Sequence, residues 1–320
     1  MHPYLIAYRI LMPRRYRHYL GRAGGDVDMC HECLLHGTFY EEYCLYGFAH
    51  KDDRHRRLYL TDAVRDRICR QINGREGSRV VMDKYRSYER LKEFYHRKVW
   101  SPRRDTAEEI VASGMKYGKL VCKPVNQAGG RGVSLLTGHD EEYWRRVVAE
   151  LLAENFGIVF EEVIAQDSSL SCFNTSSVNT VRMNTIFRNG QVTHFYPFIR
   201  TGRQGSFVDN GAQGGLFASI DAASGIITTQ AYDEKGKCYD SHPDSGTPFR
   251  GFQIPLWDDL LAMTERMAHT MPDMTYIGWD MALAMDGWCC VEANKGEFVA
   301  QQLTLGRGLR EEFESLVFGK

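Results

Sequence analysis

YIGWDMALAMDGWCCVEANKGE, residues 276–297, alternates apolar side chains with other types around an Asp-Gly pair. This pattern predicts a β-hairpin with strands over 277–285 and 288–293 and a turn at Asp286-Gly287. Such a fold brings Asp280 close to Glu292 and Asn294, which share a face because they are two residues apart. Two carboxylates and an amide oxygen suit Mg²⁺, which prefers oxygen ligands. The stretch is therefore a candidate magnesium site, and solvated acids at a polar hairpin end are the alternative.

The composition is that of a globular protein with a sizeable core. The chain has 320 residues, of which 43% are hydrophobic, so two or three subdomains are expected. The 40 basic and 41 acidic residues nearly cancel, and no recognition module is present, which argues against a nucleic-acid partner. Basic residues concentrate over 9–22 and 54–104, which indicates a solvated helical face or, alternatively, an anionic ligand.

Nine cysteines are scattered along the chain, and neither a signal peptide nor an apolar run near 18 residues is apparent. We therefore expect a reduced, cytoplasmic protein. The segment CHECLLH, Cys30 to His36, resembles a zinc knuckle, but its ligands would be cramped, so a half-buried helix is favoured. Residues 1–20 mix aromatic, aliphatic and Arg residues. They predict a helix docked on the core, with contact to a membrane surface as the alternative.

The pattern along the chain predicts an α+β fold preceded by a mainly helical region. Helical spacing covers 39–72, is interrupted at 74–78, and resumes in a helix over 83–98 that Asp83 caps and Trp100-Ser-Pro closes. Strand, loop, strand, helix and strand then follow over 119–164, with the helix at 140–155. We expect three parts: a helical region over 1–80, a small α+β unit with its leading helix over 81–164, and a larger unit over 165–320.

The larger unit is predicted to be rich in strands. An Asn189-Gly190 turn joins two alternating runs, and a second hairpin is expected at 223–225. A surface loop over 232–252 precedes a helix over 255–271, the hairpin described above and a last helix over 308–318.

Two features of the small unit suggest an anionic ligand. The Gly-rich loop over 126–134 can direct backbone N–H groups at phosphates, although it is not a P-loop because no Gly-Lys-Ser/Thr ending or helix follows. Lys123 precedes this loop on an otherwise apolar strand, where it needs an anionic partner unless it lies at a solvated edge.

Charged residues also occur inside other apolar strands. Either Glu161 or Glu162 could accept a hydrogen bond from an adenine amino group or a ribose hydroxyl, unless the strand is an edge with one solvated acid. Arg182 and Arg200 are single arginines in uncharged strands, an arrangement that clamps phosphate or carboxylate or else forms structural ion pairs.

The order of these features over residues 80–317 resembles the ATP-grasp enzymes. The shared elements are a Lys strand, KPxxxxGGxGV, a strand with Glu-Glu, Asn-Thr-x-Arg, and Asp followed by Glu-x-Asn. The closer similarity is to the sugar-transfer-associated branch, through SVNTVRMNT, GSFVDNGAQGGLFASID and the opening stretch. The resemblance implies an ATP-grasp fold, in which two α+β subdomains grip ATP.

The resemblance also implies roles for single residues. Lys84 and Lys123 would be the two ATP lysines, and Asp280, Glu292 and Asn294 the magnesium ligands. Arg182 and Arg200 would hold the γ-phosphate or an acyl phosphate. The remaining residues group by ligand: the phosphate-covering loop Gly129, Gly130, Arg131 and Gly132; the adenine linker Glu161, Glu162 and Val163; a ribose carboxylate at Glu162 or Asp167; and an acceptor side at Asp209, Asn210, Gly214 and Gly215.

The activity implied by this family is ATP- and Mg²⁺-dependent joining of a carboxylate to an amine through an acyl phosphate. Both substrates would be small molecules in polysaccharide or secondary-metabolite biosynthesis. A small-molecule kinase on the same fold and a nucleotide-binding protein without turnover are the alternatives. One departure concerns residues 1–80, which are helical and aromatic where the superfamily usually has a nucleotide-like α/β domain.

Overall fold

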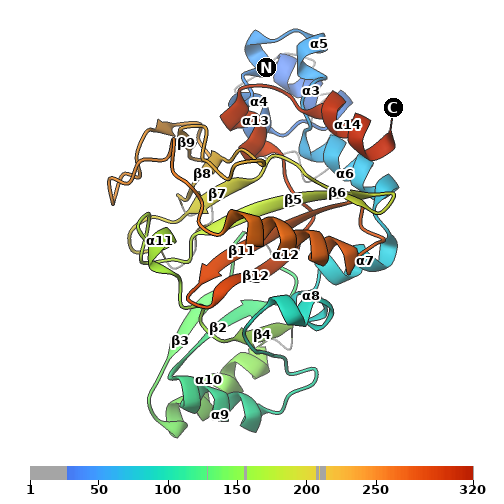
Figure 1. Cartoon of the computed structure of the whole chain (residues 1–320). Coiled ribbons are helices and arrows are strands. Elements are labelled where there is room, and N and C mark those ends of the chain that lie inside the picture. Colours follow the sequence, from blue (N-terminus) through green and yellow to red (C-terminus); the bar gives the residue numbers. More distant parts are fainter. Residues whose placement is uncertain (1–26, 128, 155–156, 207–208, 210–213, 320) are drawn as a thin grey trace.

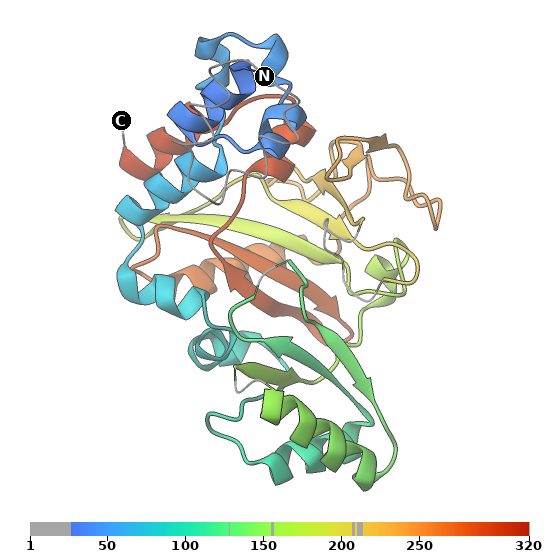
Figure 2. The ribbon, with the colours of Figure 1, turned by 180° about the vertical axis from the view of Figure 1, so that it is seen from behind.

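The computed structural model describes residues 27–319, apart from 128, 155–156, 207–208 and 210–213 (Figure 1). The predicted segment over 1–20 lies outside these residues. The described chain forms two antiparallel sheets with helices packed around them, as expected for an α+β fold. In both Figure 1 and Figure 2 the small sheet lies at one end of the molecule, and the first and last helices lie together at the other.

The smaller sheet has four strands in the order β1-β4-β2-β3. Its elements are β1 (Val99–Trp100), α9 (Ala107–Tyr117), β2 (Lys119–Pro124), β3 (Ser134–Thr137), α10 (Glu141–Glu154) and β4 (Ile158–Glu161). Both helices pack on this sheet around the fully buried Trp144. The predicted strand over 158–164 is shorter, since β4 ends at Glu161.

The larger sheet has eight strands in the order β10-β9-β8-β7-β5-β11-β12, with β6 paired to β5. The strands are β5 (Thr180–Arg188), β6 (Gln191–His194), β7 (Phe198–Thr201), β8 (Leu216–Ser219), β9 (Ala231–Tyr232), β10 (Cys238–Tyr239), β11 (Tyr276–Ala284) and β12 (Gly287–Asn294). The Asn189-Gly190 hairpin is confirmed as β5–β6. The expected surface loop over 232–252 instead contains β10, which pairs with β9.

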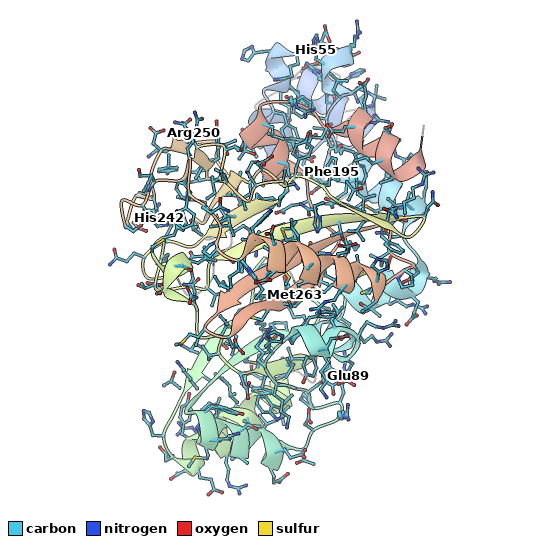
Figure 3. The ribbon with its side chains drawn as sticks, viewed as in Figure 1. His55, Glu89, Phe195, His242, Arg250 and Met263 are labelled. Atoms are coloured by element: carbon cyan, nitrogen blue, oxygen red, sulfur yellow. The ribbon has the colours of Figure 1, made fainter. Side chains whose placement is uncertain are left out.

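The two faces of the larger sheet differ because side chains alternate along its strands. Trp279 and Met281 of β11 share a core with Met263 of α12 (Trp257–His269), which covers one face (Figure 3). Asp280 and Arg182 lie on intervening positions and so face the opposite side. That second face carries the site described below.

Helices of the N-terminal region and of the C-terminus cover part of the second face. These are α3 (Val27–His36), α4 (Tyr40–Leu45), η2 (Phe48–His50), α5 (Asp53–Arg56), α6 (Asp62–Ile72), α13 (Val299–Leu305) and α14 (Arg310–Phe318). The short α11 (Ser168–Ser171) follows the small sheet instead, and its Leu170 belongs to the core shared with α12. Phe195, labelled in Figure 3, packs against Phe298 and Phe313 in a core shared with α6. The side chain of Asn73 bonds both the N–H and the C=O of Tyr276, which fixes the helical region to β11.

The region between α6 and the small sheet corrects two predictions. The interruption predicted over 74–78 is shorter, because α6 ends at Ile72 and α7 (Arg75–Val81) already begins after Gly74. Asp83 does cap the next helix, accepting from the N–H groups of Tyr85 and Arg86, but α8 (Lys84–Leu91) ends early and passes into η3 (Lys92–Phe94). Trp100 lies in β1 rather than closing a helix.

The hairpin of β11 and β12 is confirmed, with its turn one residue earlier than predicted. Ala284 pairs with Gly287, so the turn residues are Met285 and Asp286. The register then shifts between Asp280 and Met281, and this β-bulge returns Asp280 to the position opposite Glu292.

The segment that resembles a zinc knuckle is helical. Cys30 to His36 lie in α3 with both cysteines buried, and no group of three or more Cys, His, Asp or Glu able to hold a metal occurs among the described residues. All nine cysteines are free. None of the helices in the described part of the chain has both the length and the apolar character needed to cross a bilayer.

Candidate functional site

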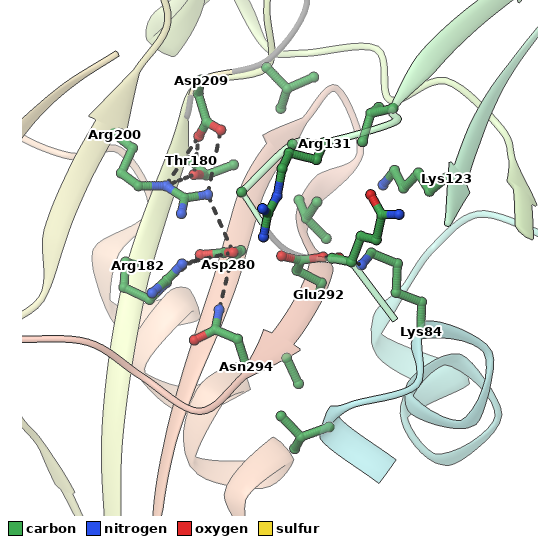
Figure 4. A pocket seen from close by; sticks show the side chains of 18 of the residues that line it. Lys84, Lys123, Arg131, Thr180, Arg182, Arg200, Asp209, Asp280, Glu292 and Asn294 are labelled. Carbon is green, nitrogen blue, oxygen red and sulfur yellow. Dashed lines mark hydrogen bonds and ion pairs between the residues drawn. The ribbon is translucent and has the colours of Figure 1, made fainter. Parts of the chain in front are cut away.

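A cavity of about 790 Å³ lies between the two sheets, a volume typical of sites for small ligands and cofactors. The small sheet and its Gly-rich loop form one wall, and β5, β7, β11 and β12 form the other (Figure 4). Most of the residues singled out in the sequence line it, although they come from segments up to about 200 positions apart.

Asp280 lies at the centre of this cavity and is buried. Its carboxylate accepts hydrogen bonds from Nε and Nη2 of Arg182, the latter at 3.0 Å, and pairs with Nη2 of Arg200 at 3.3 Å. Nδ2 of Asn294 donates to the same carboxylate at 3.2 Å. Burial alone would raise the pKa of Asp280, but Arg182 and Arg200 outweigh burial and lower it, so the carboxylate stays ionised.

The residues predicted to bind magnesium fit that ion in their chemistry. Asp280 pairs directly with Glu292 across the hairpin, and Asn294 lies two residues further along β12. The Glu292 carboxylate is 29% exposed and lies 3.6 Å from Nζ of Lys84. Oδ1 of Asn294 accepts from the N–H of Gly296 at 2.9 Å and has a second lone pair. Three oxygen donors suffice for Mg²⁺, which takes its other ligands from phosphates and water.

Arg200 belongs to a second polar group beside Asp280. Its Nε donates to Oγ1 of Thr180 at 3.2 Å and lies 3.4 Å from Asp209, to which the Thr180 hydroxyl also donates. Burial raises the pKa of Asp209 even though Arg200 and Thr180 act to lower it. Both arginines thus form ion pairs with carboxylates of the protein, which is the alternative considered for them, and Arg182 also pairs with Glu297 at 3.4 Å.

The two predicted ATP lysines lie at the opposite end of the cavity. Nζ of Lys84 donates to the Gln127 carbonyl at 2.5 Å and so fastens the Gly-rich loop to α8. Nζ of Lys123 pairs with Oε2 of Glu161 at 2.9 Å. Burial would raise the pKa of Glu161, but Lys123 and Arg97 lower it to about 2. Glu161 is therefore an ionised partner of two cations rather than an exposed edge acid.

Some predicted residues do not line the cavity. The Asp167 carboxylate caps α11 by accepting from the N–H of Ser169, which makes Glu162 the better ribose candidate. Gly132, Gly214 and Gly215 do not line the cavity, although both neighbours of Gly132 in the chain do, and Asn210 is outside the described residues. Those that do line it are Gly129, Gly130, Arg131, Glu161, Glu162 and Val163.

Sequence reasoning missed several lining residues. Arg65 of α6 reaches the cavity from the N-terminal region, where Asp62 and Asp66 hold its guanidinium at 2.7 and 2.9 Å. Glu234 from the loop after β9 and Glu297 from the loop after β12 line the same end. Nothing in the sequence near Arg65 marks it, because its place depends on how α6 packs on the larger sheet.

Comparison with protein families assigns the chain. A model described as sugar-transfer associated ATP-grasp matches residues 63–317, so the chain belongs to this family. The predicted ATP-grasp fold, with its mainly helical N-terminal segment, is thereby confirmed. Membership suggests ATP-dependent ligase-type chemistry. Comparison with curated protein sequences finds no match.

Solved structures with a similar fold are distant in sequence. D-alanyl-alanine synthetase A from Vibrio cholerae O1 biovar eltor is 14% identical over 77% of this chain and 67% of its own, with a TM-score of 0.49. The ATP-grasp ligase PsnB, solved with a phosphomimetic variant of its minimal precursor, Mg and ADP, is 15% identical over 80% and 66%, with a TM-score of 0.46. D-alanine–D-alanine ligase from Bacillus anthracis is 13% identical over 80% and 72%, with a TM-score of 0.44.

Proposed function

We propose that the protein is an ATP-dependent carboxylate–amine ligase that forms an amide through an acyl phosphate. One observation carries this proposal: a single cavity brings Lys84 and Lys123 together with the oxygen donors of the β11–β12 hairpin and two arginines. Membership in the ATP-grasp family supports ATP as the nucleotide.

The nucleotide binds between the two sheets in this proposal. The units over 81–164 and 165–320 grip the nucleotide between them, with Glu161 to Val163 beside adenine and Glu162 at the ribose. Lys84 and Lys123 bind phosphate oxygens, and the Gly129–Gly132 loop closes over them. Asp280, Glu292 and Asn294 would hold Mg²⁺, which neutralises charge on the phosphates as the γ-phosphoryl group moves.

The chemistry then requires positioning more than a protein nucleophile. An oxygen of the substrate carboxylate attacks the γ-phosphorus and ADP leaves, which gives an acyl phosphate. The amine attacks the acyl carbon, and phosphate leaves with a proton from the amine. Arg182 and Arg200 stabilise the negative charge at this centre, and Asp209 lies on the acceptor side.

The setting of the reaction is part of the proposal. The family description links such domains to sugar transfer, so we place the product in polysaccharide or secondary-metabolite biosynthesis. The nine free cysteines fit a reducing, cytoplasmic location. Asn210, Gly214 and Gly215 remain predictions for the acceptor side.

ADP release in Mg-ATP tests this function against a panel of amino acids and uronic acids, with and without amines. Hydroxylamine serves as a general acceptor because it converts an acyl phosphate to a hydroxamate. We expect ADP formation that needs both an acid and an amine, with a product of amide mass. Turnover with a hydroxyl acceptor alone, giving a phosphorylated product, would contradict the ligase assignment.

A further inference from the structure

Arg97 lies where the chain passes from η3 to the small sheet, and its side chain is buried. Its side chain is 5% exposed, and its guanidinium carbon lies 4.6 Å from the centre of the Tyr95 ring. A buried guanidinium is costly unless its charge is paired and its N–H groups are bonded.

Each of the five N–H groups of Arg97 has an acceptor. Nε and Nη2 donate to Oε2 of Glu161 at 3.1 and 2.8 Å. Nη1 donates to the carbonyls of Tyr95 at 3.2 Å and Cys290 at 2.5 Å, and Nη2 donates to that of Val291 at 3.0 Å. Arg97 thus bonds β4 of the small sheet and β12 of the large one together.

Val291 is the extra residue of the β-bulge in β12. Met281 pairs with Cys290 while Asp280 pairs with Glu292, so Val291 has no partner on β11. An unbulged strand would put Val291 opposite Asp280 and turn the Glu292 side chain to the other face of the sheet. Two of the carbonyls that Arg97 binds, those of Cys290 and Val291, belong to this bulge.

Glu161 connects Arg97 to Lys123 of the small sheet. Oε2 of Glu161 accepts from Arg97 and also pairs with Lys123 at 2.9 Å. Both cations therefore converge on a single carboxylate oxygen. Through this oxygen, Arg97 is connected to Lys123.

We propose that Arg97 is a positioning residue that fixes Lys123 of the small sheet relative to Glu292 of the large sheet. The phosphate-binding and magnesium-binding parts of the cavity are thereby aligned by one buried guanidinium. This inference rests on the proposed function, which assigns Lys123 to phosphate and Glu292 to Mg²⁺.

Two substitutions at Arg97 test its contacts with Glu161 and with the bulge carbonyls. Arg97→Lys keeps the charge beside Glu161, but a compact ammonium cannot also reach both bulge carbonyls as the planar guanidinium does. We expect its apparent Mg²⁺ affinity, titrated with ADP present, to fall about 10- to 100-fold, as for other residues that orient metal ligands. Its ADP affinity in EDTA should stay near that of the wild type. Arg97→Met removes both contacts, so both affinities should fall.

Calorimetry with ADP and Mg²⁺ measures these affinities without turnover, and thermal unfolding verifies that each variant is folded. Arg104→Lys is the matched control, because Arg104 lies seven positions on and pairs at the surface with Glu89, with 62% of its side chain exposed. If Arg97→Met does not fold, Arg97→Lys decides alone.

The outcomes distinguish this inference from the proposed function. A folded Arg97→Lys protein with the Mg²⁺ affinity of the wild type would overturn the positioning role while leaving ATP chemistry intact. A wild-type protein that binds no ADP, with or without Mg²⁺, would overturn the proposed function and the positioning role with it.

Discussion

Asp280 and Glu292 face each other in the cavity but differ in their surroundings. Asp280 is buried and bonded by Arg182, Arg200 and Asn294, so its removal would take one carboxylate partner from each of two buried cations. Glu292 is partly exposed and lies 3.6 Å from Nζ of Lys84. Glu292 is therefore the residue at which metal binding can be tested without unfolding the protein.

Glu292→Gln should lower ADP release by about 10²–10³-fold, because it removes one charged ligand from the phosphoryl-transfer site. ADP binding in EDTA should persist, since the lysines and the Gly-rich loop are unchanged. Steady-state kinetics and calorimetry measure the two effects. Glu311→Gln, an exposed substitution on α14, is the control, and wild-type turnover by the Glu292 variant would refute the magnesium assignment.

Glu161 gives a prediction about pH. Its pKa is lowered from 4.5 to about 2 in the folded protein, so its contribution to the free energy of unfolding is present above pH 4.5 and is lost as the pH falls toward 2. Glu161→Gln should be less stable at neutral pH and should lack this part of the acid-induced loss. Urea unfolding between neutral pH and about pH 3 measures both, and equal acid slopes for the two proteins would exclude the effect.

Single residues were predictable where the signal was local. The alternation around Asp286-Gly287 was enough to place Asp280, Glu292 and Asn294 together. The bulge at Val291 was not predictable, because no residue type marks it. Arg97 was missed because its partners lie 64 and about 194 residues away and are mostly backbone carbonyls.

At the scale of elements, helix α9 shows that a signal can be present and still be overlooked. Thr106 and Glu109 form a capping box, which is a sequence signature of a helix start. By contrast, α13 begins after Phe298 without a side-chain cap, so its start carries no such mark. Asp83 and Asn189-Gly190 were predicted correctly, since a cap and a tight turn depend on adjacent residues.

The packing of α9 on α10 gives a test of the fold. A Cβ added at Gly114 would lie 2.3 Å from a ring carbon of the buried Trp144. Gly114→Ala should therefore lower the free energy of unfolding by about 1–3 kcal/mol through overpacking, despite the better helix propensity of Ala. Chemical unfolding measures the change. Met115→Ala on the exposed face of the same helix is the control, and a stabilised Gly114 variant would show the contact to be wrong.

At the scale of the whole molecule, the N-terminal helices are part of the cavity and not a separate appendage. Arg65 of α6 lines the cavity, and the Asn73 side chain bonds this region to β11. The helical character of the region could be predicted from its periodicity. Its contact with the site could not, because that contact depends on tertiary packing between residues about 200 positions apart.

The central claim is that a substrate carboxylate is activated by phosphorylation within this cavity. The most direct measurement uses the acid identified by ADP release, with its carboxylate labelled by a heavy oxygen isotope. An acyl phosphate transfers one labelled oxygen to the phosphate that leaves, so mass spectrometry should find one labelled oxygen per phosphate for each amide formed. Amide formation with unlabelled phosphate would contradict the account.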